Sequence, residues 1–300
     1  MVVAPLTLTC LVLATLFVAL LPVVLFRRLR RPLGLNGRDA IAGVAVFALF
    51  AMVIERALNS YVLHQNQTVV AWLSNPLAFV IYGSLAAGVC EEVGRFIAMK
   101  LMWRRAVDGA AKAASAGASA VTDTGRKPSL EARVAMRRKS VAAPSTGDST
   151  ALGYGIGHGG AEAWMVGVLI QIQWIVFAVV ENRGELDTYL GNVPADSLMR
   201  IHLILASLAP QMAGIFVVER VAALVFQIGL SVLMWHGVRA GWRAVLPLAI
   251  VVHAVVDVPA ALFQARVLPL YAVDGLYALL AVIVAAVLVK RFRQPAARFA

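Results

Sequence analysis

Residues 76–103 read PLAFVIYGSLAAGVCEEVGRFIAMKLMW, an apolar stretch that is interrupted by two carboxylates and one arginine. A run of about 20 apolar residues is long enough to cross the hydrocarbon core of a bilayer as a helix. Placing one charge at that depth costs roughly 2.5–3.5 kcal/mol on insertion scales, and such charges usually pair inside a bundle and serve a function. The stretch therefore predicts a membrane-spanning helix in which Glu91, Glu92 and Arg95 form part of a functional site.

The composition places the whole chain in the same class. Of its 300 residues, 61% are hydrophobic and only 14% are charged, whereas about 25% are charged in an average soluble domain. The net charge of +11 is concentrated in short clusters beside the apolar runs, which is the pattern of cytoplasmic loops. We therefore expect an all-α, polytopic transmembrane bundle that forms one membrane-embedded domain over residues 1–300. Its expected partner is the lipid bilayer, and nucleic acid is not expected.

Seven apolar runs are long enough to span a membrane. They cover residues 3–26, 39–62, 76–102, 151–180, 211–236, 245–264 and 270–289. Lys and Arg cluster in alternate loops, which predicts an N-terminus outside and a C-terminus inside. Segment 104–150 is rich in Ala, Ser, Gly and Thr without apolar periodicity, so we expect a disordered cytoplasmic loop there. The stretch 184–210 is expected to hold a surface helix after Asp196.

Three of the predicted spans carry polar residues at helical spacing. The third contains the EEVGR sequence, the fourth opens with GYGIGHGGAE and the sixth contains VVHAVVD. Residues four apart lie on one face of a helix, so His158 can lie beside Glu162 and His253 beside Asp257. At 1.5 Å per residue, these groups and Glu91 all fall roughly 10–18 Å from the cytoplasmic ends of their spans. Polar groups that share one depth on three helices indicate one shared site.

The residue types in this layer suit metal-assisted hydrolysis. Neutral imidazole and carboxylate oxygen are common ligands of Zn²⁺, and a catalytic zinc keeps one position open for water. A further carboxylate can then accept the proton of that water. The two cysteines, Cys10 and Cys90, lie in different predicted spans and form neither a CxxC motif nor a disulfide framework.

The elements EEVGR, GIGHGGAE and HAVVD, in this order on three spans, resemble the YhfC family of intramembrane metalloproteases. That family is a distant relative of the CAAX-processing and bacteriocin-processing endopeptidases. The resemblance covers residues 76–264 and implies a helical bundle with a membrane-embedded proteolytic site. It implies that Glu91 activates a water, and that His158 and His253 are ligands or orient the water. By the same resemblance, Asp257 is a fourth ligand or a partner of the oxyanion.

The resemblance also implies that Arg95 holds Glu92 in place by an ion pair. The chain departs from the CAAX-type pattern in two respects, since it has EExxR in place of EExxxR and an additional Glu162. Which carboxylate is the base and which is a ligand therefore remains open. The candidate catalytic residues are Glu91, Glu92, Arg95, His158 and Glu162, and the candidate zinc ligands are His158, His253 and Asp257. The expected substrate is a membrane-associated peptide or protein, and the expected location is a bacterial cytoplasmic membrane.

Two other functions use the same residues. Chains of Glu, Asp and His also form ion and proton pathways in transporters, although transporters often contain inverted repeats and we find no such repeat in this sequence. In a non-catalytic membrane scaffold, the polar layer would only hold the helices together.

The remaining polar residues receive structural interpretations. Glu219 and Arg220 lie within the fifth apolar run and are expected either to pair with groups of neighbouring helices or to help close the outer side of the bundle. Glu55 and Arg56 are expected near the outer interface of the second span, and His202 in a solvated segment.

Overall fold

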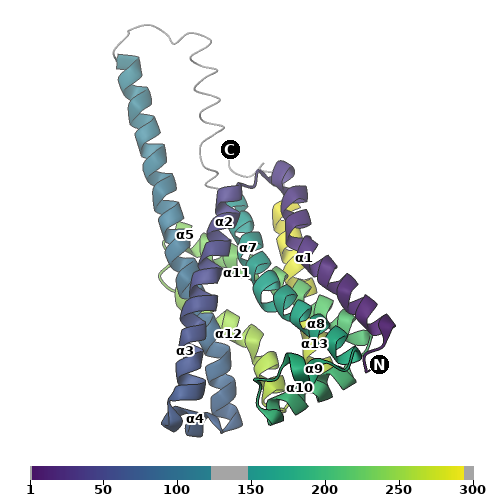
Figure 1. Ribbon diagram of the computed structural model, residues 1–300. Coiled ribbons are helices and arrows are strands. Elements are labelled where there is room, and N and C mark those ends of the chain that lie inside the picture. The colour runs from purple at the N-terminus through teal and green to yellow at the C-terminus, as the bar shows by residue number, and fades with distance from the viewer. Residues whose placement is uncertain (1, 123–147, 294–300) are drawn as a thin grey trace.

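The computed structural model describes residues 2–122 and 148–293, and every element in these two ranges is helical (Figure 1). In chain order the elements are α1 (Pro5–Leu33), α2 (Gly37–Leu49), η1 (Phe50–Glu55), α3 (Arg56–Ser60), η2 (Tyr61–Gln65), α4 (Gln67–Leu73), α5 (Pro76–Thr122), α7 (Asp148–Glu162), η3 (Ala163–Val168), α8 (Leu169–Asn182), α9 (Leu186–Tyr189), α10 (Ala195–Ser207), α11 (Gln211–Arg239), α12 (Val245–Gln264) and α13 (Leu270–Arg293). The three η elements are π-helical, and each continues the α-helix before it.

The predicted all-α polytopic bundle is confirmed. Among the described residues, seven helical segments are long and apolar enough to cross a membrane. The sixth predicted span, 245–264, coincides with α12, and the others differ from the observed helices mainly at their ends. The predicted surface helix is α10, which begins one residue before Asp196. The orientation of the termini relative to the membrane stays a prediction.

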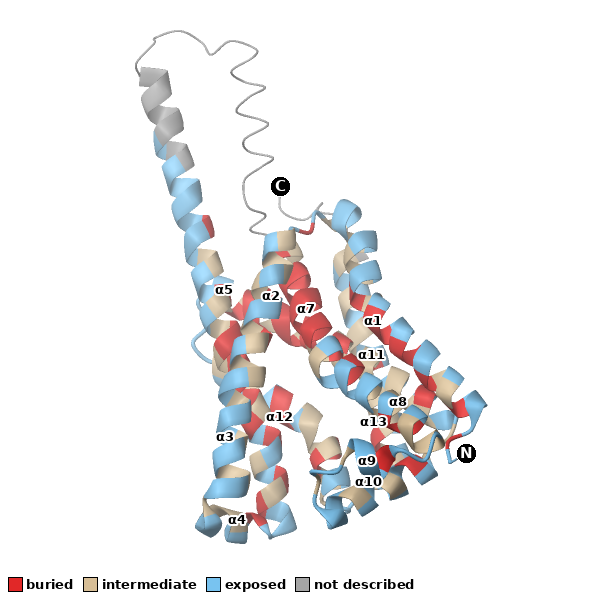
Figure 2. Ribbon diagram, viewed as in Figure 1, coloured by how far each residue is buried: buried red, intermediate tan, exposed pale blue. Residues whose placement is uncertain are grey.

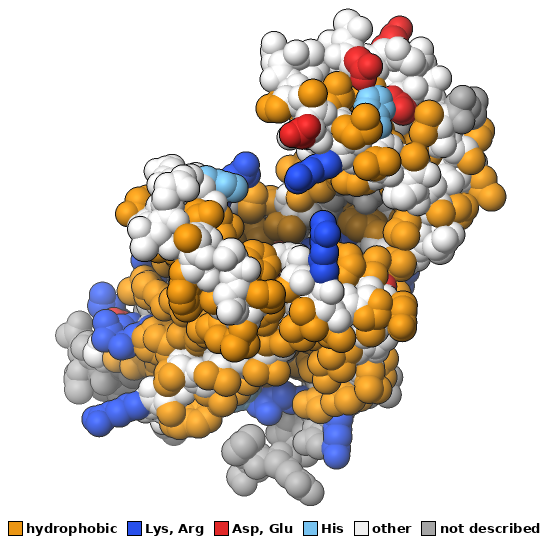
Figure 3. All heavy atoms as spheres, turned by 90° about the horizontal axis from the view of Figure 1, so that it is seen from below, with side chains coloured by type: hydrophobic (Ala, Val, Ile, Leu, Met, Phe, Trp, Pro, Cys, Tyr) orange, Lys and Arg blue, Asp and Glu red, His pale blue; other side chains and the backbone are white. Residues whose placement is uncertain are grey.

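Large apolar side chains cover much of the outer surface of the bundle. Ile41, Leu77 and Val282 are each more than 60% exposed, and many apolar side chains are also exposed in Figure 3, which shows the bundle from the end where α4, α9 and α10 lie. Contiguous apolar surface of this extent is rare on soluble monomers. In a bilayer the same surface meets hydrocarbon, while the backbone hydrogen bonds are satisfied within each helix.

Helix α7 is the most deeply buried element. Every residue from Thr150 to Ala161 is buried, and Figure 2 shows α7 enclosed by α1, α2 and α11. Two glycines allow α2 and α7 to approach closely. A Cβ atom on Gly157 would overlap the backbone of Ala40, and one on Gly43 would overlap the backbone of Tyr154. The glycines thus set the distance between α2 and the helix that carries His158.

Gly157→Ala is therefore expected to destabilise the bundle. Because the added methyl group meets rigid backbone, the helices must separate, and overpacking of this kind costs about 1–3 kcal/mol. Thermal unfolding in detergent measures the effect as a lower melting temperature. Gly37→Ala is the matched control, since a Cβ on Gly37 at the start of α2 meets nothing within 4 Å. Equal melting temperatures for the two variants would contradict the assigned contact.

The structure differs from the expectation for segment 104–150 at both ends. Helix α5 continues to Thr122, and α7 begins at Asp148. Alanine and lysine are strong helix formers, and the sequence AVDGAAKAASAGASAVT at 106–122 is rich in alanine. The helix therefore extends beyond the point at which its apolar pattern stops. Residues 123–147 lie outside the described ranges, so disorder of the loop stays a prediction for them.

A histidine of α10 contacts both α8 and α9 at one end of the bundle. In α10, His202 Nδ1 lies 2.9 Å from Glu181 Oε1 and its Nε2 lies 2.7 Å from Asp187 Oδ1. Acidic side chains gather with a histidine on this part of the face seen in Figure 3. Hydrogen bonds that the His202 ring donates to the Glu181 and Asp187 carboxylates raise the pKa of His202 above its ordinary value of 6.5. The expectation that His202 is only solvated was incomplete, because the turn at Gly184 brings both carboxylates to it.

These contacts predict that α10 is held more firmly at mildly acidic pH. A histidine with a raised pKa contributes its stabilisation fully below pH 6.5 and loses it as the pH rises through the raised pKa. Hydrogen exchange of α10 amides, corrected for the intrinsic pH dependence, should therefore be slower at pH 6 than at pH 9. His202→Gln should remove this difference, whereas His64→Gln should preserve it. The same pH dependence in His202→Gln would show that another group is responsible.

Candidate functional site

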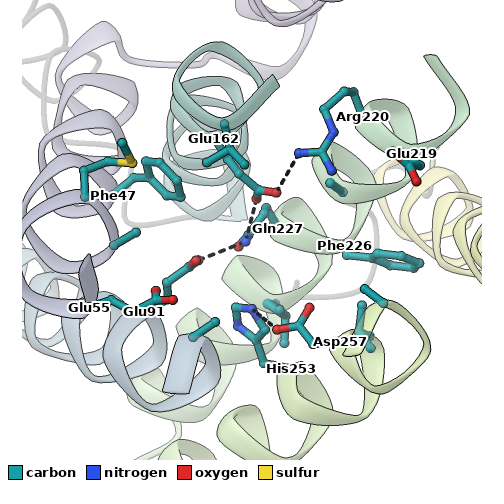
Figure 4. A pocket seen from close by; sticks show the side chains of 18 of the residues that line it. Phe47, Glu55, Glu91, Glu162, Glu219, Arg220, Phe226, Gln227, His253 and Asp257 are labelled. Atoms are coloured by element: carbon teal, nitrogen blue, oxygen red, sulfur yellow. Dashed lines mark hydrogen bonds and ion pairs between the residues drawn. The ribbon is translucent and has the colours of Figure 1, made fainter. Parts of the chain in front are cut away.

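A cavity of about 450 Å³ lies among the helices that carry the predicted site residues. Its walls come from α2, η1, α3, α5, α7, η3, α11, α12 and α13, and Figure 4 shows it from close by. The polar or ionisable side chains that line it are Glu55, Arg56, Asn59, Glu91, Glu162, Glu219, Arg220, Gln227, His253, Asp257 and Tyr277. Glu55 and Arg56, which we expected near the outer interface, thus face the same space as the site residues.

Glu91 lies on the cavity wall and is held from two sides. Its Oε2 atom accepts a hydrogen bond from Gln227 Nε2 at 2.9 Å and lies 2.9 Å from His158 Nε2. The His158 ring is fixed in turn by aromatic neighbours. Phe47 meets it edge-on with ring centroids 5.3 Å apart, and Tyr154 stacks on it at 5.8 Å. The carboxylate therefore faces the cavity with its imidazole partner behind it.

A second group of polar contacts joins α5 to α12. Arg95 donates hydrogen bonds to Glu92 Oε1 and to Gln227 Oε1. His253 Nδ1 lies 2.8 Å from the same Glu92 oxygen, and its Nε2 lies 3.5 Å from Asp257 Oδ2. The predicted ion pair of Glu92 with Arg95 is confirmed. These contacts turn the Nε2 edge of His253 toward the cavity.

Gln227 is a central residue that the sequence analysis did not identify. It lies on α11, is 5% exposed, and donates from Nε2 to both Glu91 and Glu162 at 2.9 Å. Its carbonyl oxygen accepts from Arg95. One amide therefore joins the two polar groups into a single network. The available signal was a lone amide in the apolar sequence ALVFQIGL of the fifth span.

Glu162 occupies the opposite wall of the cavity from His253 (Figure 4). Its Oε1 atom lies 3.5 Å from Arg220 Nη1, so the expected pairing of Arg220 with a neighbouring helix is confirmed. The π-helical element η3 begins directly after Glu162, and π-helical turns inside α-helices often occur at functional sites.

The structure brings all seven predicted site residues together, in two layers. Glu91, Glu162, His253 and Asp257 line the cavity. Glu92, Arg95 and His158 are fully buried behind it and contact the lining residues. The lining residues are thus placed to meet a substrate, and the buried residues are placed to hold them.

The arrangement does not converge on a metal centre. Over residues 2–122 and 148–293, no group of three His, Cys, Asp or Glu side chains is placed to hold a metal ion. Imidazole and carboxylate are suitable donors for zinc, but His158 contacts Glu91 while His253 contacts Glu92 and Asp257. The residues as arranged do not fit a three-ligand site, and the assignment of His158, His253 and Asp257 as zinc ligands stays a prediction.

Comparison with known proteins supports the resemblance carried by the three motifs. The chain is 29% identical, over 252 residues, to a Bacillus subtilis (strain 168) protein named "Uncharacterized membrane protein YhfC", and the match covers 82% of this chain and 80% of that protein. No solved structure matches the chain. The seven apolar spans and this relative make the protein an integral membrane protein. The family described as YhfC intramembrane metalloprotease matches residues 17–119 and 133–278, which is most of the chain, and the protein therefore belongs to this family.

Proposed function

We propose that this protein is an intramembrane endopeptidase in which Glu91 activates a water for attack on a peptide bond. The observation that carries the proposal is the placement of Glu91, which lines the cavity while His158 and Gln227 hold its carboxylate. A general base must lie within hydrogen-bond reach of the proton it removes. Glu91 is the carboxylate of the EEVGR sequence that meets this condition, because Glu92 is turned away and paired with Arg95.

The proposed reaction uses one water and returns every proton. Glu91 takes a proton from the water, and the resulting hydroxide adds to the carbonyl carbon of the substrate. The Nε2 edge of His253, which Glu92 orients, faces the oxygen on which negative charge develops. The proton on Glu91 then passes to the leaving nitrogen as the carbon–nitrogen bond breaks. The products are one new carboxyl end and one new amino end.

The family description implies a metal ion, and zinc is the identity that we propose because His and carboxylate donors suit it. Binding by His158, His253 and Asp257 would require these side chains to leave their present partners. No step of the proposed reaction passes through the metal. Metal quantification by mass spectrometry tests the assignment: about one zinc per wild-type chain, lost in the His158→Ala/His253→Ala variant, would support it.

The proposed substrate is a membrane-associated peptide or protein, and the proposed location is a bacterial cytoplasmic membrane with the N-terminus outside. The cavity supports a membrane substrate because its wall combines ionisable groups with apolar side chains such as Phe47 and Phe226 (Figure 4). A peptide segment that leaves the bilayer can thus bury apolar side chains while its backbone meets the polar layer.

Reconstitution into proteoliposomes tests the proposal. A library of apolar peptides is incubated with the reconstituted protein, and new peptide ends are identified by mass spectrometry. We expect new ends with the wild type, formed far more slowly with Glu91→Gln. Substrate-driven ion flux without any peptide cleavage would overturn the proposal in favour of a transporter.

A further inference from the structure

A second cavity, of about 440 Å³, lies on the opposite side of α7 from the polar network. Side chains of α1, α2, α7 and η3 form it, and Figure 2 shows α7 behind the space between α1 and α2. Phe26, Val44, Ile156 and Met165 are among its apolar lining residues. We refer to this cavity as the α1–α2 groove.

The two ends of the α1–α2 groove differ in chemistry. At one end is Trp164, whose Nε1 donates to the Ala19 carbonyl at 3.0 Å. At the other end are Arg27 and Arg30, the only charged residues among the described lining residues. The groove is therefore an apolar channel that runs from an indole at one end to two cations at the other.

The position of the two arginines along α1 matches the level of lipid headgroups. Arg27 is 22 residues after Pro5, or roughly 33 Å along the helix, which is about the thickness of the hydrocarbon core. Arg27 and Arg30 are three residues apart and share one face of α1. Arg28 and Arg31 belong to the same basic cluster but do not line the groove.

We propose that the α1–α2 groove binds one anionic phospholipid. Its phosphate lies between Arg27 and Arg30, because guanidinium groups form paired, charge-assisted hydrogen bonds with phosphate oxygens. One acyl chain follows the apolar lining toward Trp164. From Arg27 to the level of Ala19, α1 rises roughly 12 Å. The groove therefore holds the part of the acyl chain that is nearest the headgroup. Two cations without an acidic lining residue favour an anionic headgroup over a zwitterionic one.

The site is independent of the proposed peptidase reaction, and it has a structural consequence for α7. Gly157 and Gly160 line the α1–α2 groove, and His158 between them contacts Glu91 on the other side of the helix. A lipid in the groove therefore packs against the helix that holds the buried imidazole.

Lipid binding to the full-length chain tests the proposal. The purified protein is titrated with phosphatidylglycerol or phosphatidylcholine in detergent, and bound lipid is counted by native mass spectrometry. We expect one phosphatidylglycerol per chain to bind more tightly than phosphatidylcholine. In Arg27→Gln/Arg30→Gln the affinity for phosphatidylglycerol should fall about tenfold or more, given the attraction of each cation for anionic lipid. Val44→Phe, which fills the groove from an exposed position of α2, should reduce binding of both lipids.

Arg28→Gln/Arg31→Gln is the matched control, because it removes the same charge from the same cluster outside the groove. Its affinity should remain within twofold of the wild type. Equal losses in the two double variants would overturn the proposal by showing unspecific attraction to the basic cluster. Displacement of the lipid by inorganic phosphate alone would overturn it as well, as would a dimer of the wild type that Val44→Phe dissociates, since a second chain would then occupy the groove.

Discussion

Glu91→Gln is expected to lower the rate of peptide cleavage by about a thousandfold while the bundle stays folded. Glutamine has the shape of glutamate and still accepts a hydrogen bond from Gln227, but it cannot take a proton from water. General bases contribute about 10²–10⁴-fold to enzymatic rates, and this proposed mechanism contains no second base. The measurement is the initial rate of peptide cleavage in proteoliposomes, together with the melting temperature of each variant.

Two further variants make this result specific. Glu219→Gln removes a carboxylate from the same cavity wall without touching the contacts of Glu91, so its rate should stay close to that of the wild type. His158→Ala removes the imidazole that holds Glu91 and should also abolish most cleavage. If His158→Ala kept full activity, the proposed orientation of Glu91 would be wrong, and full activity of Glu91→Gln would contradict the peptidase mechanism itself.

The membrane spans were predictable because spanning depends on one simple property of the sequence, the length of a continuous apolar run. A helix must stay apolar over about 20 residues to cross the hydrocarbon core, so the run at 245–264 coincides with α12. The end of α5 was not predictable in this way. Beyond the hydrocarbon core, helix propensity determines where the helix ends. The alanine-rich sequence after Trp103 therefore continues α5 to Thr122.

The site was predictable to the extent that its contacts are local. Helical spacing alone places Glu92 beside Arg95 and His253 beside Asp257, and both contacts are present. The same spacing places His158 beside Glu162, but in the structure His158 contacts Glu91 while Glu162 contacts Gln227 and Arg220. Contacts between helices depend on how α5, α7, α11 and α12 pack, which spacing does not describe. The sequence therefore indicated that His158 belongs to the site but not that it contacts Glu91.

Arg95→Ala is expected to have the largest effect on stability. Arg95 is fully buried, and its guanidinium donates to Glu92 and to Gln227. Breaking a buried ion pair by removing one partner costs about 3–5 kcal/mol, because the other charge is left uncompensated. For a chain of this size that loss corresponds to a melting temperature about 10 °C lower. Thermal unfolding in detergent measures it, with Arg56→Ala as the control for an arginine that lines the cavity outside the network.

The double variant Glu92→Gln/Arg95→Met separates the two parts of this cost. If the uncompensated carboxylate causes the loss, neutralising Glu92 should recover part of the stability that Arg95→Ala removes, since replacing both charges of a buried pair is often tolerated. Cleavage should not recover, because His253 then loses the carboxylate that orients its ring. A double variant as unstable as Arg95→Ala would instead assign the cost to the lost hydrogen bond between Arg95 and Gln227, and would make that amide the residue on which the polar layer depends.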